Sequence, residues 1–316
     1  MSEEQLLQIT PGLRPTMLTV LAHPDDESFG LGGTLAFYAW CGTAVHLVCA
    51  TGGEVGHSTP EMLQGYSSLA ELRTDELRCA AAKLGLASVE LLGYRDSGMP
   101  GTPDNQHPQA LAAAPLPEVV TRVTRAIRRV RPQVVITFDP IGGYRHPDHI
   151  AIHLATVEAF HAAGNPDIVT EALPPYQPQK LYFTTFSRRL LRLFVTLMPL
   201  FGKDPRRFGR NQDVDLASIA LEQFPIHAWI DFLPVAEQKA AAIACHASQG
   251  SDTDPSLVQR AVAWLFRHMS GKETFIRAYP PPTPQLKERD LFAGVEFAPG
   301  ADGRNGAYRA SAFIEQ

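Results

Sequence analysis

The feature that most constrains the fold is a short apolar run, Met17 to Ala22, that stops abruptly in the polar segment His23-Pro24-Asp25-Asp26-Glu27. An apolar segment from Thr34 to Trp40 follows and predicts a helix. A strand that leads through a polar turn into a helix is typical of open α/β sheets, in which ligands bind outside the carboxyl ends of the strands. Pro24 biases His23 toward extended backbone, which keeps the imidazole at the strand tip. One imidazole and three carboxylates therefore reach the usual place for a site.

A second predicted strand, Val134 to Phe138, ends in the same way, in a polar segment that runs from Asp139 to His149. Pro147 suits the first turn of a helix predicted over Ile150 to Ala163. The start of that helix presents His146, Asp148 and His149. The adjacent aspartates of the first cluster would repel each other, and a bound cation removes that repulsion. Two clusters of His and Asp at strand tips therefore predict a metal site.

Strands and helices alternate along the chain at a spacing that gives a parallel sheet covered on both faces. Further strands are predicted at Ala44 to Thr51, Val89 to Leu92, Lys180 to Thr185 and Trp229 to Phe232. Further helices are predicted over Ser68 to Leu84, Pro117 to Val130, Val235 to His246 and Leu257 to Met269. The fold class is therefore α/β, a Rossmann-like three-layer α/β/α arrangement with a mostly parallel sheet, plus a C-terminal insertion and extension.

The predicted domain organisation is a single α/β domain over residues 1–280, followed by an extension over 281–316. The core of the domain is expected at 16–163, and 164–280 is less regular. Within the latter, the apolar segment Leu190 to Phe201 has arginines on both sides and leaves three interpretations open. A buried helix or a substrate-site lid within 187–224 is favoured. A contact in a homo-oligomer and association with a membrane surface through the basic flanks are the alternatives.

Composition excludes two kinds of partner. The chain has 316 residues and a formal net charge of −5, which argues against nucleic acid, because phosphate binding needs a concentrated basic face. No apolar run approaches the ~20 residues that span a bilayer, and the first residues lack the build of a signal peptide. We therefore expect a cytoplasmic protein without an integral membrane segment. Buried free thiols are expected for all four cysteines, since no C-x-x-C pair occurs: Cys41, Cys49, Cys79 and Cys245.

Two motifs, AHPDDE at residues 22–27 and HPDH at 146–149, resemble those of the LmbE-like deacetylases of the PIG-L family. That family includes N-acetylglucosaminyl-phosphatidylinositol deacetylases and bacterial thiol-pathway enzymes. The contexts GGYRHPDH and RDSGM, the latter at 95–99, look closest to mycothiol-type deacetylases and conjugate amidases. The resemblance covers residues 16 to 160 and resumes in KAAAIACHASQ at 239–249 and GKETF at 271–275.

The resemblance implies that His23, Asp26 and His149 are metal ligands. One carboxylate and two imidazoles suit Zn²⁺ in a catalytic site, which keeps a coordination position open for water or substrate. Another divalent metal is left open, because availability as well as affinity selects the occupant. Asp25, beside a ligand, is expected to act as the general base that removes a proton from water.

Residues around the second motif are expected to act on the reacting amide. His146 could protonate the leaving amine or stabilise the oxyanion, and Asp148 could hydrogen-bond His146 and raise its pKa. The alternative for Asp148 is a helix N-terminal charge. Tyr144 resembles the family tyrosine that donates to the oxyanion, and packing is its alternative.

Arg73 and Asp96 resemble positions that contact the sugar in the mycothiol-type enzymes, and Glu54 is a weaker candidate of the same kind. A guanidinium and a carboxylate each bind sugar hydroxyls in fixed geometry. The alternatives are a surface helix charge for Arg73 and a loop cap for Asp96. His246, in the HASQ stretch, is left undecided.

The function predicted is that of a metal-dependent hydrolase that removes an N-acetyl group from an N-acetylglucosamine-type substrate. The partner is accordingly a small N-acylated amino sugar. An amidase that cleaves a larger N-acyl group or a thiol conjugate is the alternative within the enzyme class. A non-catalytic nucleotide- or sugar-binding module is the alternative of another class. The first strand lacks the G-x-G-x-x-G that a dinucleotide fold would place after it, which argues against the nucleotide module.

Overall fold

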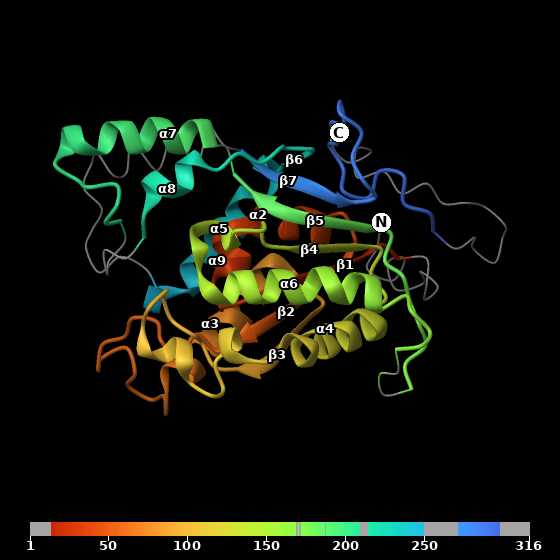
Figure 1. Ribbon diagram of the computed structural model, residues 1–316, viewed down its shortest axis with the longest axis horizontal. Helices are drawn as coiled ribbons and strands as arrows, with labels where there is room; N and C mark the ends of the chain where they lie inside the picture. The colour runs from red at the N-terminus through yellow and green to blue at the C-terminus, as the bar shows by residue number, and fades with distance from the viewer. Residues whose placement is uncertain are drawn as a thin grey trace.

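A seven-stranded sheet with helices on both faces organises the chain in a computed structural model (Figure 1). The structure describes residues 14–168, 170, 172–186, 188–208, 214–249 and 271–297. The strand order is β3-β2-β1-β4-β5-β7-β6. The parallel strands are β1 (Thr16–Leu21), β2 (Ala44–Thr51), β3 (Ser88–Tyr94), β4 (Val134–Thr137) and β5 (Lys180–Thr185). At one edge, β7 (Lys272–Tyr279) pairs antiparallel with both β5 and β6 (Ala228–Asp231).

Helices cover the sheet in two layers, as Figure 1 shows for the nearer one. One layer contains α4 (Leu116–Val130) and α6 (Pro147–Ala162), which pack on each other and on β1. The other contains α2 (Asp26–Trp40), α3 (Leu69–Leu84) and α9 (Ala236–Cys245), which contact one another. The central strands are buried on both faces, which explains why they read as continuous apolar runs. The predicted three-layer fold with a mostly parallel sheet is confirmed.

The first half of α2 was not predicted as helix, because the polar motif and glycines hide any apolar period there. The helix begins at Asp26 and bends at Leu31, whose φ of −144° is non-helical. The bend releases the backbone N–H groups of Gly33 and Thr34, which donate to the two carboxylate oxygens of Glu273 on β7 at 3.0 and 2.7 Å. Lys239 of α9 neutralises that carboxylate at 2.5 Å. The GKETF and KAAAIACHASQ stretches thus meet at this bend.

Part of the expected extension packs into the fold. Leu291 and Phe292 are buried in the main core, and the Glu288 carboxylate accepts from Lys180 at 2.8 Å and from the Tyr182 hydroxyl at 2.7 Å. The strand β7 was recognised only as a motif, since its last residues look like the start of a loop. The predicted helix over Leu257 to Met269 lies outside the described residues.

The expectation of four thiols is wrong for one pair. Cys79 and Cys245 form a disulfide that joins α3 to the end of α9, whereas Cys41 and Cys49 are buried thiols. Its apolar neighbours in sequence suggested that Cys79 is buried, but it lies on an exposed turn of α3, outside the apolar face of that helix. The helix α9 packs beside α3. Because 166 residues separate the two cysteines, the bond removes much conformational freedom from the unfolded chain, worth about 2–4 kcal/mol.

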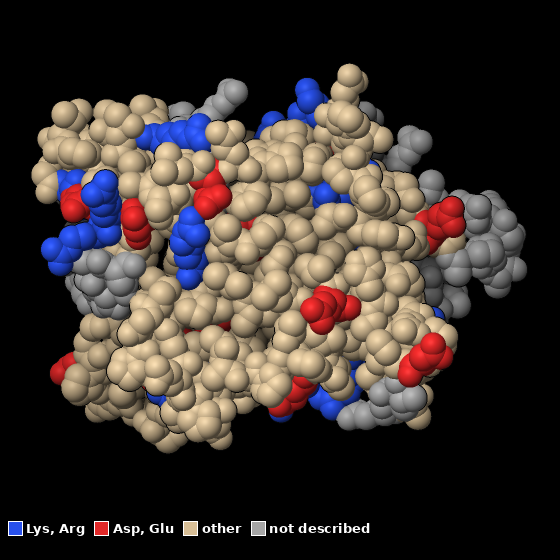
Figure 2. Space-filling model, viewed as in Figure 1, with Lys and Arg blue, Asp and Glu red and all other residues tan. Residues whose placement is uncertain are grey.

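The segment expected as a buried helix or lid lies at the surface, which makes the buried-helix interpretation wrong. It comprises α7 (Arg188–Leu197), the 3₁₀ helix η3 (Met198–Phe201) and α8 (Leu216–Leu221), which project from one end of the sheet in Figure 1. Leu200 and Phe201 are 77% and 74% exposed. Lys and Arg side chains gather over this part of the surface, with a few carboxylates among them (Figure 2).

Among the helices of the described chain, none is both long enough and apolar enough to cross a membrane.

Candidate active site

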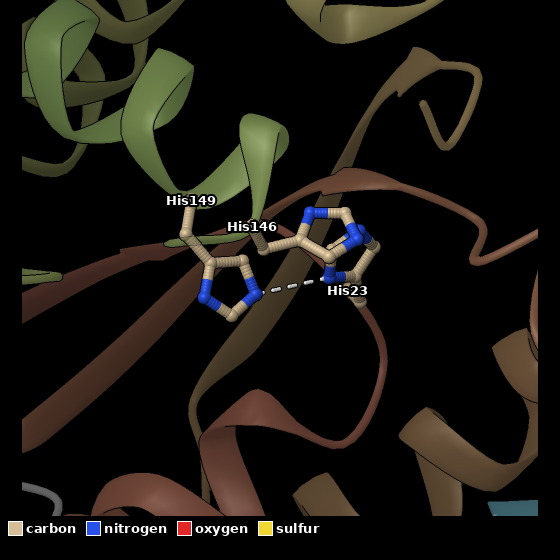
Figure 3. Close-up of side chains that lie close together, drawn as sticks. All are labelled: His23, His146 and His149. Carbon is tan, nitrogen blue, oxygen red and sulfur yellow. Dashed lines mark hydrogen bonds between the residues drawn. The ribbon is translucent and has the colours of Figure 1, made fainter. Parts of the chain in front are cut away.

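The two His/Asp motifs meet because β1 and β4 are neighbouring parallel strands. The chain leaves β1 toward β2 on one side, while β4 lies on the other, so the sheet order reverses between them. Ligands of open α/β sheets bind at such switch points, outside the carboxyl ends of the strands. His23 follows β1, and α6 begins after β4 with His146 as its N-cap. Figure 3 shows His23, His146 and His149 gathered there.

The three predicted metal ligands converge on one point. The Nδ1 of His23 lies 3.2 Å from the Nε2 of His149 (Figure 3), and the Asp26 carboxylate lies 3.5 Å from the former and 3.3 Å from the latter. Two imidazole nitrogens that face each other at this distance can share only one proton. A cation between them would satisfy both lone pairs and the carboxylate. The donor set therefore fits a divalent metal held by His23, Asp26 and His149.

The electrostatics of the cluster agree with a cation site. Burial alone would lower the pKa of His23, but the carboxylates of Asp148, Asp26 and Asp96 raise it well above the usual value. Burial opposes the charge of Asp26, yet the imidazoles of His149 and His23 hold the pKa of that carboxyl well below its usual range. Negative charge that stabilises a proton on His23 would equally stabilise a metal ion in its place.

The carboxylate of Asp148 contacts His23 and Ser97, not the imidazole of His146, so the side-chain contact predicted for it is wrong. Its Oδ2 lies 3.1 Å from the Nε2 of His23 and accepts from the Ser97 N–H at 2.8 Å, and its Oδ1 accepts from the Ser97 hydroxyl. In the first turn of α6 the side chain points across to β1, while its backbone N–H donates to the Nδ1 of His146 at 3.2 Å. Asp148 therefore fixes the orientation of His23, a predicted ligand.

His146 is neutral, which decides between the two roles predicted for it. Burial and the nearby His23 and His149 lower the pKa of His146 to about 2, contrary to the predicted rise. Because Nδ1 accepts the helix N–H, the ring proton must sit on Nε2. The imidazole is thus a hydrogen-bond donor through Nε2, which suits stabilisation of an oxyanion better than protonation of an amine.

Asp25 lies beside the ligands in a strained backbone conformation. Its φ is 111°, a region that costs a non-glycine residue about 1–3 kcal/mol and that clusters at functional sites. Its Oδ2 accepts from the Nη2 of Arg73 at 3.1 Å. Burial raises the pKa of Asp25 to about 7 although Arg73 opposes the rise. A carboxylate with a pKa near neutrality is matched to the work of a general base.

Arg73 is 4% exposed, so the alternative of a surface helix charge is wrong. Besides Asp25, its guanidinium donates to the carbonyl oxygens of Pro24 at 2.6 Å and Gly53 at 2.9 Å. The approach is so close that a Cβ on Gly53, at a φ of 69°, would meet the Nη1 of Arg73 at 2.1 Å. Arg73 therefore braces the turn that carries Asp25, and its predicted contact with a sugar stays a prediction.

Asp96 and Glu54 lie in the loops that follow β3 and β2. The Asp96 carboxylate accepts from Gly98 at 2.8 Å and lies 3.5 Å from the Nε2 of His23. Glu54 accepts from the backbone N–H of Asp96 at 2.8 Å, so the two acidic residues are linked. Among the described residues, two groups of side chains could hold a metal ion: one is His23, His146 and His149, and the second is His23, Asp96, His146 and Asp148. Asp96 is thus placed at the site, and Glu54 behind it.

Tyr144 lies in α5 (Gly142–Arg145), a short irregular turn before α6. Its ring is 37% exposed and lies 5.0 Å from that of His149, edge to face. Burial of the phenol and the nearby Asp26 carboxylate raise the pKa of Tyr144 above its usual range, so the hydroxyl keeps its proton and can donate. Gly142 is required here, because a Cβ would meet the Cβ of His149 at 2.8 Å.

Two site residues were missed from the sequence, and Glu27 was placed at the site without a role. Phe138 stacks on His149 with ring centroids 3.9 Å apart, and Ser97 holds Asp148. Glu27 accepts from the backbone N–H of Asp25 at 2.9 Å and lies 2.7 Å from His246. Each of these residues stands within or next to a motif that the sequence had already singled out, and this was the available signal.

The sheet is Rossmann-like, and its switch point brings together two imidazoles and a carboxylate, with the Asp25 carboxylate beside them. This combination defines a metal-dependent hydrolase. Residues 18–160 match the PIG-L family, described as GlcNAc-PI de-N-acetylase. The chain belongs to this family, and it is a deacetylase that hydrolyses a linear amide C–N bond. A non-catalytic nucleotide- or sugar-binding module is thereby ruled out.

Relatives extend the match beyond the family segment. The chain is 36% identical to the 1D-myo-inositol 2-acetamido-2-deoxy-alpha-D-glucopyranoside deacetylase of Acidothermus cellulolyticus over 91% of this chain and 97% of that protein. It is 37% identical to the enzyme of the same name from Geodermatophilus obscurus, over 76% and 84%. In fold it is similar to the N,N'-diacetylchitobiose deacetylase of Pyrococcus horikoshii, with a TM-score of 0.57, 21% identity and coverage of 87% and 88%.

Proposed function

We propose that this enzyme removes the acetyl group from the 2-acetamido group of an N-acetylglucosamine joined to inositol, and that its metal is Zn²⁺. The single observation that carries the substrate is the 36% identity over nearly the full length of an enzyme named for that reaction. The likeness includes the regions after residue 160, where the family segment ends. An amidase that cleaves a larger N-acyl group or a thiol conjugate is the alternative.

His23, Asp26 and His149 would hold the metal, and Asp148 would keep His23 turned toward it. When bound, a divalent metal supplies a Lewis acid that polarises the amide carbonyl and makes water more acidic. Asp25, with its pKa near 7, takes a proton from the attacking water as the new C–O bond forms. Arg73 keeps the Asp25 carboxylate in place during the transfer.

Negative charge then develops on the former carbonyl oxygen. The Nε2–H of neutral His146 and the hydroxyl of Tyr144 are donors beside the ligands, and we assign both to that oxygen. Donors already aligned on a developing oxyanion are among the strongest contributors to catalysis. The C–N bond breaks when the nitrogen receives a proton. Protonated Asp25 is the group that holds one, so acetate and a free amine leave.

Asp96 and Glu54 are assigned to the substrate side of the site. Their loops lie at the same end of the sheet, and a cavity lined by Gly52, Glu54 and Tyr94 lies beside Glu54. Carboxylates accept two hydrogen bonds from neighbouring sugar hydroxyls. A cytoplasmic location stays part of the proposal, as does the possibility of a homo-oligomer through the exposed residues of α7 and η3.

Within the predicted lid 187–224, the described residues 188–208 and 214–224 are proposed to cover the substrate side. Glu222, just after α8, accepts from Arg145 at 2.5 Å, and Arg145 follows Tyr144 directly in α5. Replacing Glu222 by Gln should raise KM about two- to five-fold, because a half-exposed ion pair contributes about 0.2–1 kcal/mol. The matched control Asp204→Asn alters an exposed carboxylate of the same segment and should leave KM unchanged. Equal KM values for both variants and the parent would contradict the lid.

The test of the proposed function is amine release from a panel of substrates, on protein of known metal content. The panel contains N-acetylglucosamine, its inositol conjugate, an N-acetylated disaccharide and the inositol conjugate with a longer acyl chain, each with and without chelator. Chelator-sensitive release that is fastest from the N-acetylated inositol conjugate is expected. Faster release from the longer acyl chain would favour the amidase, and no release from metal-loaded protein would refute the substrate class.

A further inference from the structure

We propose that His246 is a positioning residue for the deacetylase, which acts through the buried carboxylate of Glu27 to hold the backbone of Asp25. The inference rests on the proposed role of Asp25 as the general base. His246 follows the last residue of α9, far from the metal motifs in sequence. The resemblance to the family resumes in its stretch but gives His246 no role, and the fold brings it to the turn after β1.

The contact between His246 and Glu27 is short and buried. The Nε2 of His246 lies 2.7 Å from the Oε1 of Glu27, and both side chains are fully buried. The same oxygen accepts from the Ser28 hydroxyl at 2.5 Å. Carboxylate oxygens accept hydrogen bonds, so Nε2 of His246 is the donor in this contact. A buried carboxylate needs such partners, because without them it is left unsatisfied away from water.

The second carboxylate oxygen of Glu27 links His246 to Asp25. It accepts from the backbone N–H of Asp25 at 2.9 Å. That N–H belongs to the residue with the strained φ of 111°. A non-glycine residue stays in this region only when its surroundings fix it. Glu27, itself fixed by His246, is one of the contacts that do so.

Arg73 fixes the same turn from the other side. Its Nη2 donates to the Pro24 carbonyl oxygen at 2.6 Å and to the Asp25 carboxylate at 3.1 Å. Asp25 therefore has two hydrogen bonds that hold it in place: its backbone N–H donates to Glu27, and its carboxylate accepts from Arg73. Removing Arg73 would remove a direct hydrogen bond to the Asp25 carboxylate, whereas the hydrogen bond of His246 reaches Asp25 only through Glu27. His246 is thus the cleaner residue for a test.

The neighbouring Ser248 offers a matched control. It is buried in the same segment, and it donates through both its backbone N–H and its hydroxyl to Glu76, each at 2.7 Å. These bonds tie the segment to α3 in the same way as His246 ties it to α2. They have no link to Asp25. A purely structural role for the segment would make the two positions equivalent.

The experiment compares His246→Leu, His246→Gln and Ser248→Ala in metal-loaded, full-length protein. Loss of the donor in His246→Leu should lower kcat about 10- to 100-fold, since a displacement on the scale of 1 Å costs about 100-fold. KM should stay within about two-fold of the parent, and the metal content should be unchanged. His246→Gln keeps an N–H donor for Glu27 and should recover most of kcat. Ser248→Ala should keep kcat within about two-fold. Equal kcat values for His246→Leu and the parent would overturn the proposal.

A double variant separates this proposal from the assignment of the base. In an Asp25→Asn background, His246→Leu should cost less than about three-fold, because residues that act as a unit are not additive. Full multiplicative losses would overturn the route through Asp25. Loss in Asp25→Asn without loss in His246→Leu would overturn the positioning role alone, and full activity in Asp25→Asn would overturn the base and this proposal together. Should His246→Leu fail to fold, Glu27→Leu breaks the same link, because leucine accepts no hydrogen bond from the Asp25 N–H, and it should show the same loss of kcat.

Discussion

Replacing Asp25 by Asn should lower kcat by about 10²- to 10⁴-fold, the range that general base catalysis contributes. The carboxamide keeps the size of the side chain and an oxygen for Arg73, but it cannot take a proton from water. Neither the facing nitrogens of His23 and His149 nor the Asp26 carboxylate is altered, so the bound metal should remain. Steady-state kinetics with metal analysis of the same sample is the measurement.

The control for Asp25→Asn is the same substitution at Asp75, an exposed aspartate of α3 that pairs with Arg78 at 2.8 Å. It changes the net charge equally and lies outside the site. Asp75→Asn should keep kcat within about two-fold, since isolated exposed ion pairs contribute little. Full activity of Asp25→Asn at full metal content would show that another group accepts the proton.

The sheet and the location of the site could be predicted from the sequence because both depend on local patterns. The strands over Ala44–Thr51 and Lys180–Thr185 were predicted with their observed bounds, since each is a continuous apolar run between turns. The motif after β1 and the motif after β4 were expected to meet because carboxyl ends of parallel strands share one edge. The structure places His23 and His149 in contact there.

What could not be predicted depends on contacts between distant segments. The bend of α2 at Leu31 is stable because Glu273 accepts two released N–H groups from across the sheet, and no local pattern announces that partner. The same holds for the disulfide between Cys79 and Cys245, whose partners become neighbours only when α3 packs on α9. Sequence spacing reveals which face of a helix is apolar, but it does not reveal which helix covers that face.

The roles of charged residues near the site were the least predictable. Arg73 lies four residues after Leu69 and four before Leu77, on the buried face of α3, but its charge favoured a surface interpretation. It is buried against three oxygen atoms of the turns that follow β1 and β2. Asp148 was expected to serve His146, two residues before it, but the direction of the first helical turn places the carboxylate against His23. Side-chain direction at a helix start is a matter of tertiary packing, which a motif does not encode.

Replacing His149 by Ala should abolish stoichiometric metal binding and, with it, amine release. The substitution removes one of three convergent donors, and a metal site with only three protein ligands needs all of them. Loss of a residue that merely orients a ligand typically costs 10- to 100-fold in metal affinity, so loss of a ligand should exceed about 100-fold. Metal content after dialysis against a competing chelator, measured by elemental analysis, is the readout.

The matched control for His149→Ala is His153→Ala, one turn further along α6. His153 is also a buried histidine, and its Nδ1 bonds the carbonyl oxygen of Phe138, the residue whose ring stacks on His149. Both variants therefore remove an imidazole from the same helix beside the same aromatic residue, and both should lose stability. Only His149→Ala should lose the metal. If the two variants lost metal equally, the loss would reflect damage to α6, and His149 would not be a ligand. If both kept it, the ion would have to be held by other donors, and the second group formed by His23, Asp96, His146 and Asp148 would take its place.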